Sequence, residues 1–139
     1  SEKDYTDMEL AVRYALKLKP ALLTICGGSG TRLDHTLGTL YILELCRKSG
    51  IQAVFRDRTN EAIVIGRGRT ILEKRAGYRY VSVLPVTKSI QVSLSGFKYE
   101  LVKKIISRGQ TLGISNEFTG RKAEIFVHRG LALVIQSRD

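Results

Sequence analysis

The beginning of the chain alternates between helix-like and strand-like patterns of apolar residues. Over residues 6–19 the apolar positions recur every three or four residues, which predicts an amphipathic helix that ends before Pro20. A near-continuous apolar run at 21–26 predicts a strand buried on both faces. A second helix is expected around 35–48, and a second strand at 51–55. This order of helix, strand, helix and strand is typical of a parallel, doubly wound sheet.

After about residue 60 the pattern changes to short runs with the spacing of half-buried strands. Turn residues separate these runs, and Gly96 and the segment 128–130 are expected to form hairpin turns. The second half is therefore expected to be an antiparallel sandwich or barrel. The expected strands cover 61–65, 69–73, 79–84, 90–94, 98–106, 122–127 and 131–137.

Composition narrows the class of protein. The 139 residues are 43% apolar and 26% charged, which is ordinary for a globular protein, and no apolar run approaches the length of a membrane span. Cys26 and Cys46 lie in apolar surroundings and form no CxxC pair, so we expect two buried thiols in a cytoplasmic protein, without a disulfide scaffold or zinc site. The net charge of +10 favours an anionic partner, although the basic residues are spread along the chain.

Acidic residues gather at the start of the first expected helix. Thr6 and Glu9 have the spacing of a capping box. Asp4 and Asp7 lie beside them, where the helix dipole favours negative charge. Two interpretations stay open: the segment only caps the helix, or its carboxylates hold magnesium together with nucleotide phosphates.

A glycine-rich loop, 27–30, follows the first expected strand and leads into the second helix. Backbone N–H groups of such a loop can approach phosphate oxygens. The loop lacks the further residues of dinucleotide-binding and Walker loops, and the GXXG of RNA-binding KH domains lies between helices instead. Beyond the loop, Arg32 can hold a phosphate, Asp34 can hold a metal or cap the helix, and His35 can donate a proton.

Together these segments resemble the thiamine pyrophosphokinase family. The similarity runs from end to end through five motifs, at 3–9, 28–37, 84–85, 96–99 and 115–118. The resemblance implies a partial doubly wound α/β domain, residues 1–66, followed by a thiamine-binding β-sandwich, residues 67–139. It also implies a homodimeric enzyme that uses Mg²⁺ to transfer pyrophosphate from ATP to the hydroxyl of thiamine, giving thiamine diphosphate and AMP.

The resemblance also implies roles for individual residues. Asp7 would be a magnesium ligand, and Arg32 and Asp34 would be catalytic, with Asp34 or His35 as the candidate general base. Ser115 and Asn116 would belong to the thiamine side, in the sandwich of the opposing subunit, although their chemistry alone is typical of a turn. The residues implied on the ATP side are Thr6, Asp7, Gly28, Gly30 and Arg32.

The sequence departs from the family pattern at several places. Thr31 and Glu100 stand where the family often has Gly and Pro, and there is no Trp to stack on the thiamine rings. The family's Asp-rich Gly-Asp-x-Asp-Ser segment has no match either. We therefore expect the chain to be the C-terminal portion of a longer protein, or the ordered part of one, and to be catalytically incomplete alone. Membrane and nucleic acid are not expected as partners. The alternative function is a basic RNA- or nucleotide-binding module without catalysis.

Overall fold

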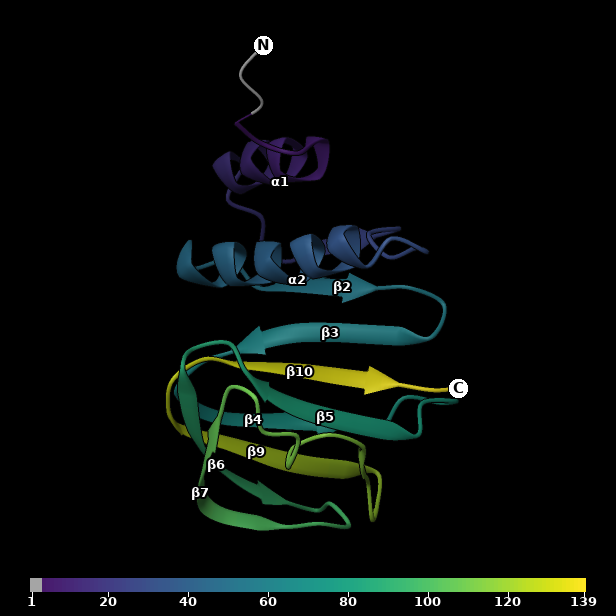
Figure 1. Ribbon diagram of the computed structural model, residues 1–139, viewed down its shortest axis with the longest axis vertical. Helices are drawn as coiled ribbons and strands as arrows, with labels where there is room; N and C mark the ends of the chain where they lie inside the picture. The colour runs from purple at the N-terminus through teal and green to yellow at the C-terminus, as the bar shows by residue number, and fades with distance from the viewer. Residues whose placement is uncertain (1–3) are drawn as a thin grey trace. The chain divides into compact units, whose positions relative to one another are not determined.

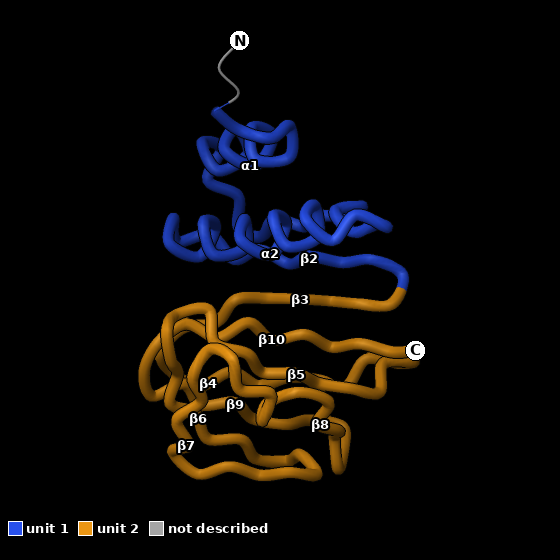
Figure 2. The backbone as a smooth tube through the Cα atoms, in the orientation of Figure 1, with its two compact units in different colours: residues 1–58 blue, residues 59–139 orange. Residues whose placement is uncertain are grey.

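The computed structural model describes residues 4–139, and its contacts divide the chain into two compact units, Ser1–Arg58 and Thr59–Asp139 (Figures 1 and 2). Among the described residues, neither α-helix is long and apolar enough to cross a membrane. Lys3, the first residue of the acidic motif, lies outside the described residues.

The first unit contains two helices and a pair of parallel strands. In chain order these are α1 (Asp7–Lys17), β1 (Leu23–Cys26), α2 (Leu33–Lys48) and β2 (Ala53–Arg56). The strands β1 and β2 run in parallel, with α2 between them in the sequence. Ile42, Leu43 and Cys46 of α2 are buried, and burial raises the pKa of the Cys46 thiol. The expected α/β character of this part of the chain is confirmed.

Thr6 begins α1 as the capping pattern predicts. Its hydroxyl accepts a hydrogen bond from the backbone N–H of Glu9, at 3.2 Å. The Glu9 carboxylate binds Arg13 one turn further along, at 2.9 Å from Nε. The Glu9 side chain therefore supports the exposed face of α1, while its backbone N–H completes the cap with Thr6.

Strand β1 differs from the expectation in its burial. Ile25 is buried, but Thr24 and Cys26 are exposed, so the prediction of a strand buried on both faces is wrong, and so is that of a buried Cys26. The apolar run was correctly assigned to a strand. No described residue covers the face of β1 that carries Thr24 and Cys26. A parallel strand is buried on both sides only where other elements pack against both of its faces.

The second unit is a sandwich of two antiparallel sheets. Within this unit the strands follow the orders β3-β10-β5-β8 and β4-β9-β6-β7. Side chains from both sheets, such as those of Val81, Ile90 and Ile125, form one hydrophobic core. This confirms the β-sandwich. The strands are β3 (Asn60–Ile65), β4 (Gly68–Glu73), β5 (Tyr80–Pro85), β6 (Ser89–Ser95), β7 (Leu101–Ser107), β8 (Asn116–Glu117), β9 (Lys122–Arg129) and β10 (Ala132–Ser137).

The two expected hairpin turns have different outcomes. Gly96 has a φ of +80° and begins the loop between the antiparallel strands β6 and β7, as predicted. The hairpin predicted at 128–130 is wrong, because His128 and Arg129 belong to β9, which pairs with β4 and β6, whereas β10 pairs with β3 and β5. The chain therefore passes from one sheet to the other at Gly130, whose φ is +87°.

Candidate functional site

A cleft of about 670 Å³ lies in the first unit. Its walls come from the start of α1, the glycine-rich loop after β1, and the first turns of α2. The start of α1 is about twenty residues away in sequence from the loop and α2, and the fold brings the polar residues of these segments to one place. His35 also borders the cleft. The residues expected on the ATP side or in catalysis that line it are Thr6, Asp7, Gly28, Gly30, Arg32 and Asp34.

The glycine-rich loop is fixed against α2 through Gly28. The Thr39 hydroxyl donates to the carbonyl oxygen of Gly28, at 3.0 Å. A Cβ at position 28 would lie 2.7 Å from the Thr39 side chain, so glycine is required by this close approach. The loop thus reaches α2 more closely than a residue with a side chain would allow.

A second contact holds the other side of the same loop. The Ser29 hydroxyl donates to a carboxylate oxygen of Asp57, at 2.6 Å, directly beyond the end of β2. Thr39 and Asp57 therefore anchor the loop to α2 and to the β2 end of the unit. Sequence reasoning missed both residues. The position of Asp57 two residues beyond the strand expected at 51–55 was the available signal, because loops after parallel strands carry binding residues.

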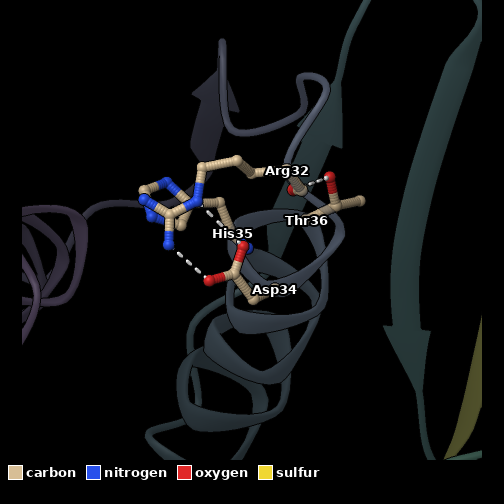
Figure 3. A network of polar contacts seen from close by, with 4 residues as sticks. All are labelled: Arg32, Asp34, His35 and Thr36. Atoms are coloured by element: carbon tan, nitrogen blue, oxygen red, sulfur yellow. Dashed lines mark hydrogen bonds and ion pairs between the residues drawn. The ribbon is translucent and has the colours of Figure 1, made fainter.

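Arg32 and Asp34 form an ion pair at the beginning of α2 (Figure 3). The Arg32 Nη2 lies 2.5 Å from Oδ2 of Asp34, and Nε lies 3.2 Å from Oδ1. Arg32 is the N-cap residue of α2, so the possibility that Asp34 is the N-cap is wrong: Asp34 lies within the first turn and accepts from the N–H of His35 at 3.0 Å.

The pair shifts the protonation of both groups. The hydrogen bond from Arg32 lowers the pKa of the Asp34 carboxyl below its ordinary value. The same hydrogen bond raises the pKa of the Arg32 guanidinium. Both side chains are largely exposed to solvent, at 66% and 64%, so the guanidinium can exchange this carboxylate for a phosphate.

Two helix N-termini border the cleft, those of α1 and α2. Backbone N–H groups in a first helical turn carry partial positive charge and favour anions. Arg32 adds a full positive charge beside the α2 terminus. The arrangement is suited to holding the phosphates of a ligand.

Carboxylates at the cleft fit a magnesium ion only in part. Over residues 4–139 no three His, Cys, Asp or Glu residues form a group that could hold a metal ion by themselves. Asp7 lines the cleft with an exposed side chain, and Mg²⁺ is commonly bound by one or two carboxylates plus substrate phosphates. Asp7 therefore fits a magnesium ion that phosphate oxygens also hold, whereas Asp34 is already paired with Arg32.

Ser115 and Asn116 lie in the second unit, where a turn was the expectation from their chemistry. Ser115 is exposed, and Asn116 begins the short strand β8, which the sequence did not predict. The Asn116 amide is 6% exposed, accepts from the N–H of Tyr99 at 3.0 Å and donates to the Tyr99 carbonyl at 2.7 Å. It also accepts from the N–H of Glu117. Asn116 thereby fixes the backbone at Tyr99, in the loop between β6 and β7.

Comparison with known families identifies both halves of the chain. Residues 1–55 match the family model "Thiamin pyrophosphokinase, catalytic domain". Residues 69–132 match the model "Thiamin pyrophosphokinase, vitamin B1 binding domain". The segment 56–68 lies between the two matches, so the domain boundary expected after residue 66 stays a prediction.

Individual relatives give the same result over the full length of the chain. The thiamine pyrophosphokinase of Bacillus subtilis (strain 168) is 35% identical over 140 residues, covering 100% of this chain. The crystal structure of thiamine pyrophosphokinase from Bacillus subtilis matches with a TM-score of 0.95, 35% identity and 100% of this chain covered. The thiamin pyrophosphokinase of Geobacillus thermodenitrificans matches with a TM-score of 0.89 and 35% identity, again over 100% of this chain. The chain spans 65% of the curated Bacillus subtilis protein, 65% of the Bacillus subtilis chain in the crystal structure and 64% of the Geobacillus chain.

Proposed function

Because the chain belongs to the thiamine pyrophosphokinase family, we propose that the protein transfers pyrophosphate from ATP to the hydroxyl of thiamine. The products are thiamine diphosphate and AMP. The observation that carries the proposal is the cleft of the first unit, which lies within the segment matched to the catalytic domain. The alternative, a basic RNA- or nucleotide-binding module without catalysis, has no support in the comparisons.

The cleft residues supply binding and charge stabilisation for this transfer. The hydroxyl oxygen of thiamine attacks the β-phosphorus of ATP, the bond from that phosphorus to the oxygen of AMP breaks, and AMP leaves. Such reactions depend mainly on positioning and on stabilisation of charge. The loop 27–30 and the two helix N-termini hold the phosphates, and Arg32 stabilises the charge that grows on the transferred group.

The proton of the thiamine hydroxyl needs an acceptor or passes to solvent. Arg32 lowers the pKa of the Asp34 carboxyl, which makes Asp34 a weak base. We assign to Asp34 the orientation of Arg32 through their two hydrogen bonds, and to His35 the acceptance of the proton. Both side chains border the cleft.

Magnesium fits this proposal through Asp7. The ion, when bound, supplies positive charge that neutralises the triphosphate. The Asp7 carboxylate would hold it together with phosphate oxygens of ATP, and Thr6 fixes the position of Asp7 by capping α1. ATP is made and used inside cells, so the cytoplasm is the proposed compartment.

The thiamine side is proposed to lie in the second unit, at Ser115 and Asn116. Its support is the match of this unit to the vitamin B1 binding domain. We also propose a homodimer whose partner sandwich completes each site. The exposed apolar side chains of the second unit support a partner, above all Val102 on the edge strand β7, which is 84% exposed, and Tyr99, which is 62% exposed.

The proposal is tested by measuring how AMP formation and thermal stability depend on each of the two substrates. We expect AMP to form from ATP only when Mg²⁺ and thiamine are both present. Thermal unfolding should show stabilisation by each ligand, reaching about 2.7 kcal/mol at a hundredfold excess over the dissociation constant. AMP formation that ignores thiamine, or an unchanged melting temperature with either ligand, contradicts the proposal.

A further inference from the structure

The wall of the cleft changes in character along α2. Arg32, Asp34 and His35 line the cleft where the helix begins, and Gly38 and Ile42 line it further along. His35, Gly38 and Ile42 are three and four residues apart, so they share one face of the helix. At about 1.5 Å of rise per residue, Ile42 lies about 10 Å along the axis from His35. The cleft therefore continues beyond its charged end along an uncharged part of α2.

Gly38 is the unusual residue of this uncharged part. It lies inside α2, where glycine lowers the stability of a helix relative to alanine. A Cβ at position 38 would meet no atom within 4 Å, so no neighbour requires the glycine. At Gly28, by contrast, the Thr39 side chain leaves no room for a Cβ. Because Gly38 lines the cleft, the space that its missing side chain leaves belongs to the cleft.

The neighbourhood of Gly38 is suited to a flat, apolar group. Among the described residues that line the cleft, Met8 and Ile42 carry apolar side chains. Ile42 follows Gly38 by one turn of α2, and Met8 comes from α1, which contacts α2. A bare stretch of helix backbone beside an apolar side chain can receive the face of a planar ring. Small-molecule sites commonly combine such apolar walls with a few polar groups, in cavities of about 300–1,000 Å³.

We propose that Gly38 and Ile42, together with Met8, form the subsite for the base of ATP. The inference rests on the proposed function, because the base belongs to the same ATP whose phosphates meet the loop 27–30 and Arg32. The missing side chain of Gly38 then admits the ring to the cleft. Inorganic tripolyphosphate has the phosphates without a ring, so its binding does not depend on Gly38.

The experiment compares ATP with inorganic tripolyphosphate, each in the presence of Mg²⁺. Calorimetry measures the binding of both to the unaltered protein, to Gly38→Ala and to Gly38→Leu, and the binding of thiamine is measured in the same way. Tyr41→Ala is the matched control, because Tyr41 lies on the same helix, is 63% exposed and does not line the cleft. Thermal unfolding measures the stability of each protein.

We expect Gly38→Ala to weaken the binding of ATP about tenfold, since its methyl group occupies the place of the ring, and Gly38→Leu to weaken it further. The affinity for tripolyphosphate should stay within about twofold in both variants, and Tyr41→Ala should leave both affinities unchanged. Gly38→Ala should also raise the melting temperature by about 2–4 °C, because alanine favours the helix. Higher stability with weaker ATP binding separates the role of Gly38 in binding from a role in folding.

The inference is overturned if Gly38→Leu binds ATP as tightly as the unaltered protein does. It is also overturned if ATP and tripolyphosphate lose affinity equally, because the substitution would then disturb the phosphate end of the cleft. A loss of thiamine affinity with unchanged ATP affinity would assign the ring subsite to the vitamin and overturn the inference too. Failure of the unaltered protein to bind ATP or tripolyphosphate would contradict the proposed phosphate site itself, and this inference with it.

Discussion

Three aspartates in the first unit differ in what surrounds them. Asp34 is held by Arg32, Asp57 accepts from Ser29, and Asp7 is exposed at the wall of the cleft. The sequence shows three acids near helix or strand ends, but their partners come from the fold. At the scale of the residue, the partner decides whether a carboxylate orients an arginine, accepts a hydroxyl or is available to a metal ion.

Asp7→Asn should abolish activity while the fold stays intact. Thr6 is the N-cap of α1, so the change at Asp7 leaves the capping hydrogen bond in place. Loss of a metal ligand predicts a rate at least a hundredfold lower, or about 2.7 kcal/mol of barrier. Steady-state kinetics and urea unfolding measure the two effects. Activity within about threefold of the unaltered protein would rule out the metal assignment.

The titration of Asp34 should depend on Arg32. Since Arg32 lowers the pKa of the Asp34 carboxyl, Arg32→Ala should raise it toward the ordinary value of 3.8. Any stability from the pair is present above the ordinary pKa and is lost as the pH falls through the lowered one. Carboxyl NMR shifts followed against pH measure this, with Arg13→Ala, which removes the partner of Glu9, as the control. An Asp34 titration unchanged in Arg32→Ala would contradict the contact.

At the scale of the element, the glycine-rich loop depends on its fit to α2. Gly28→Ala places a methyl group 2.7 Å from the Thr39 side chain, so one of the two must move. We expect a loss of about 1–3 kcal/mol in the free energy of unfolding and weaker ATP binding. In a Thr39→Ala background the same change should cost less, because the two atoms at 2.7 Å are gone and only the Cβ of residue 39, at 3.2 Å, remains. Equal costs in both backgrounds, measured by urea unfolding, would show that the two positions do not meet.

Asn116→Ala should affect thiamine far more than ATP. The amide fixes the backbone at Tyr99 and Glu117, so its removal leaves partly buried backbone groups without this partner and costs about 1–3 kcal/mol of stability. If the segment belongs to the thiamine side, the KM for thiamine rises while the KM for ATP hardly changes. Thr87→Ala is the matched control, because it removes from the same unit a hydroxyl that donates to the Ser89 carbonyl and accepts from the N–H of Leu131. Equal changes in both KM values would return Asn116 to a purely structural role.

The elements show which parts of the fold a sequence can predict. The pattern of apolar residues predicted the first helix and most strands, because it reports which positions are buried and which are exposed. The second helix was predicted from its place between the glycine-rich loop and Gly50. It did not predict β8, whose two residues are too few to show a period, nor the passage between sheets at Gly130. The contacts of Asp57 and Thr39 were also missed, because they join residues 28 and 11 positions apart in sequence.

At the scale of the whole molecule, the charge is distributed unevenly between the two units. Residues 59–139 carry 14 Lys and Arg against 6 Asp and Glu, a net charge of +8 out of the total of +10. The cleft suited to phosphates lies in the other unit. The total charge favours an anionic partner but does not indicate where the site lies. Two helix N-termini and Arg32 define the site instead.

Residues 59–139 should fold as an isolated domain. All 14 buried residues of the main hydrophobic cluster belong to this unit, and they join both sheets of the sandwich. Domains of about 60 residues can fold alone when they bury a sufficient core. We expect a cooperative thermal transition and a dispersed NMR spectrum, and a loss of about 2–5 kcal/mol on Ile125→Ala, whose side chain is fully buried. A broad, non-cooperative transition would show that the sandwich needs the first unit, because its own core would then be insufficient to offset the entropy of ordering the chain.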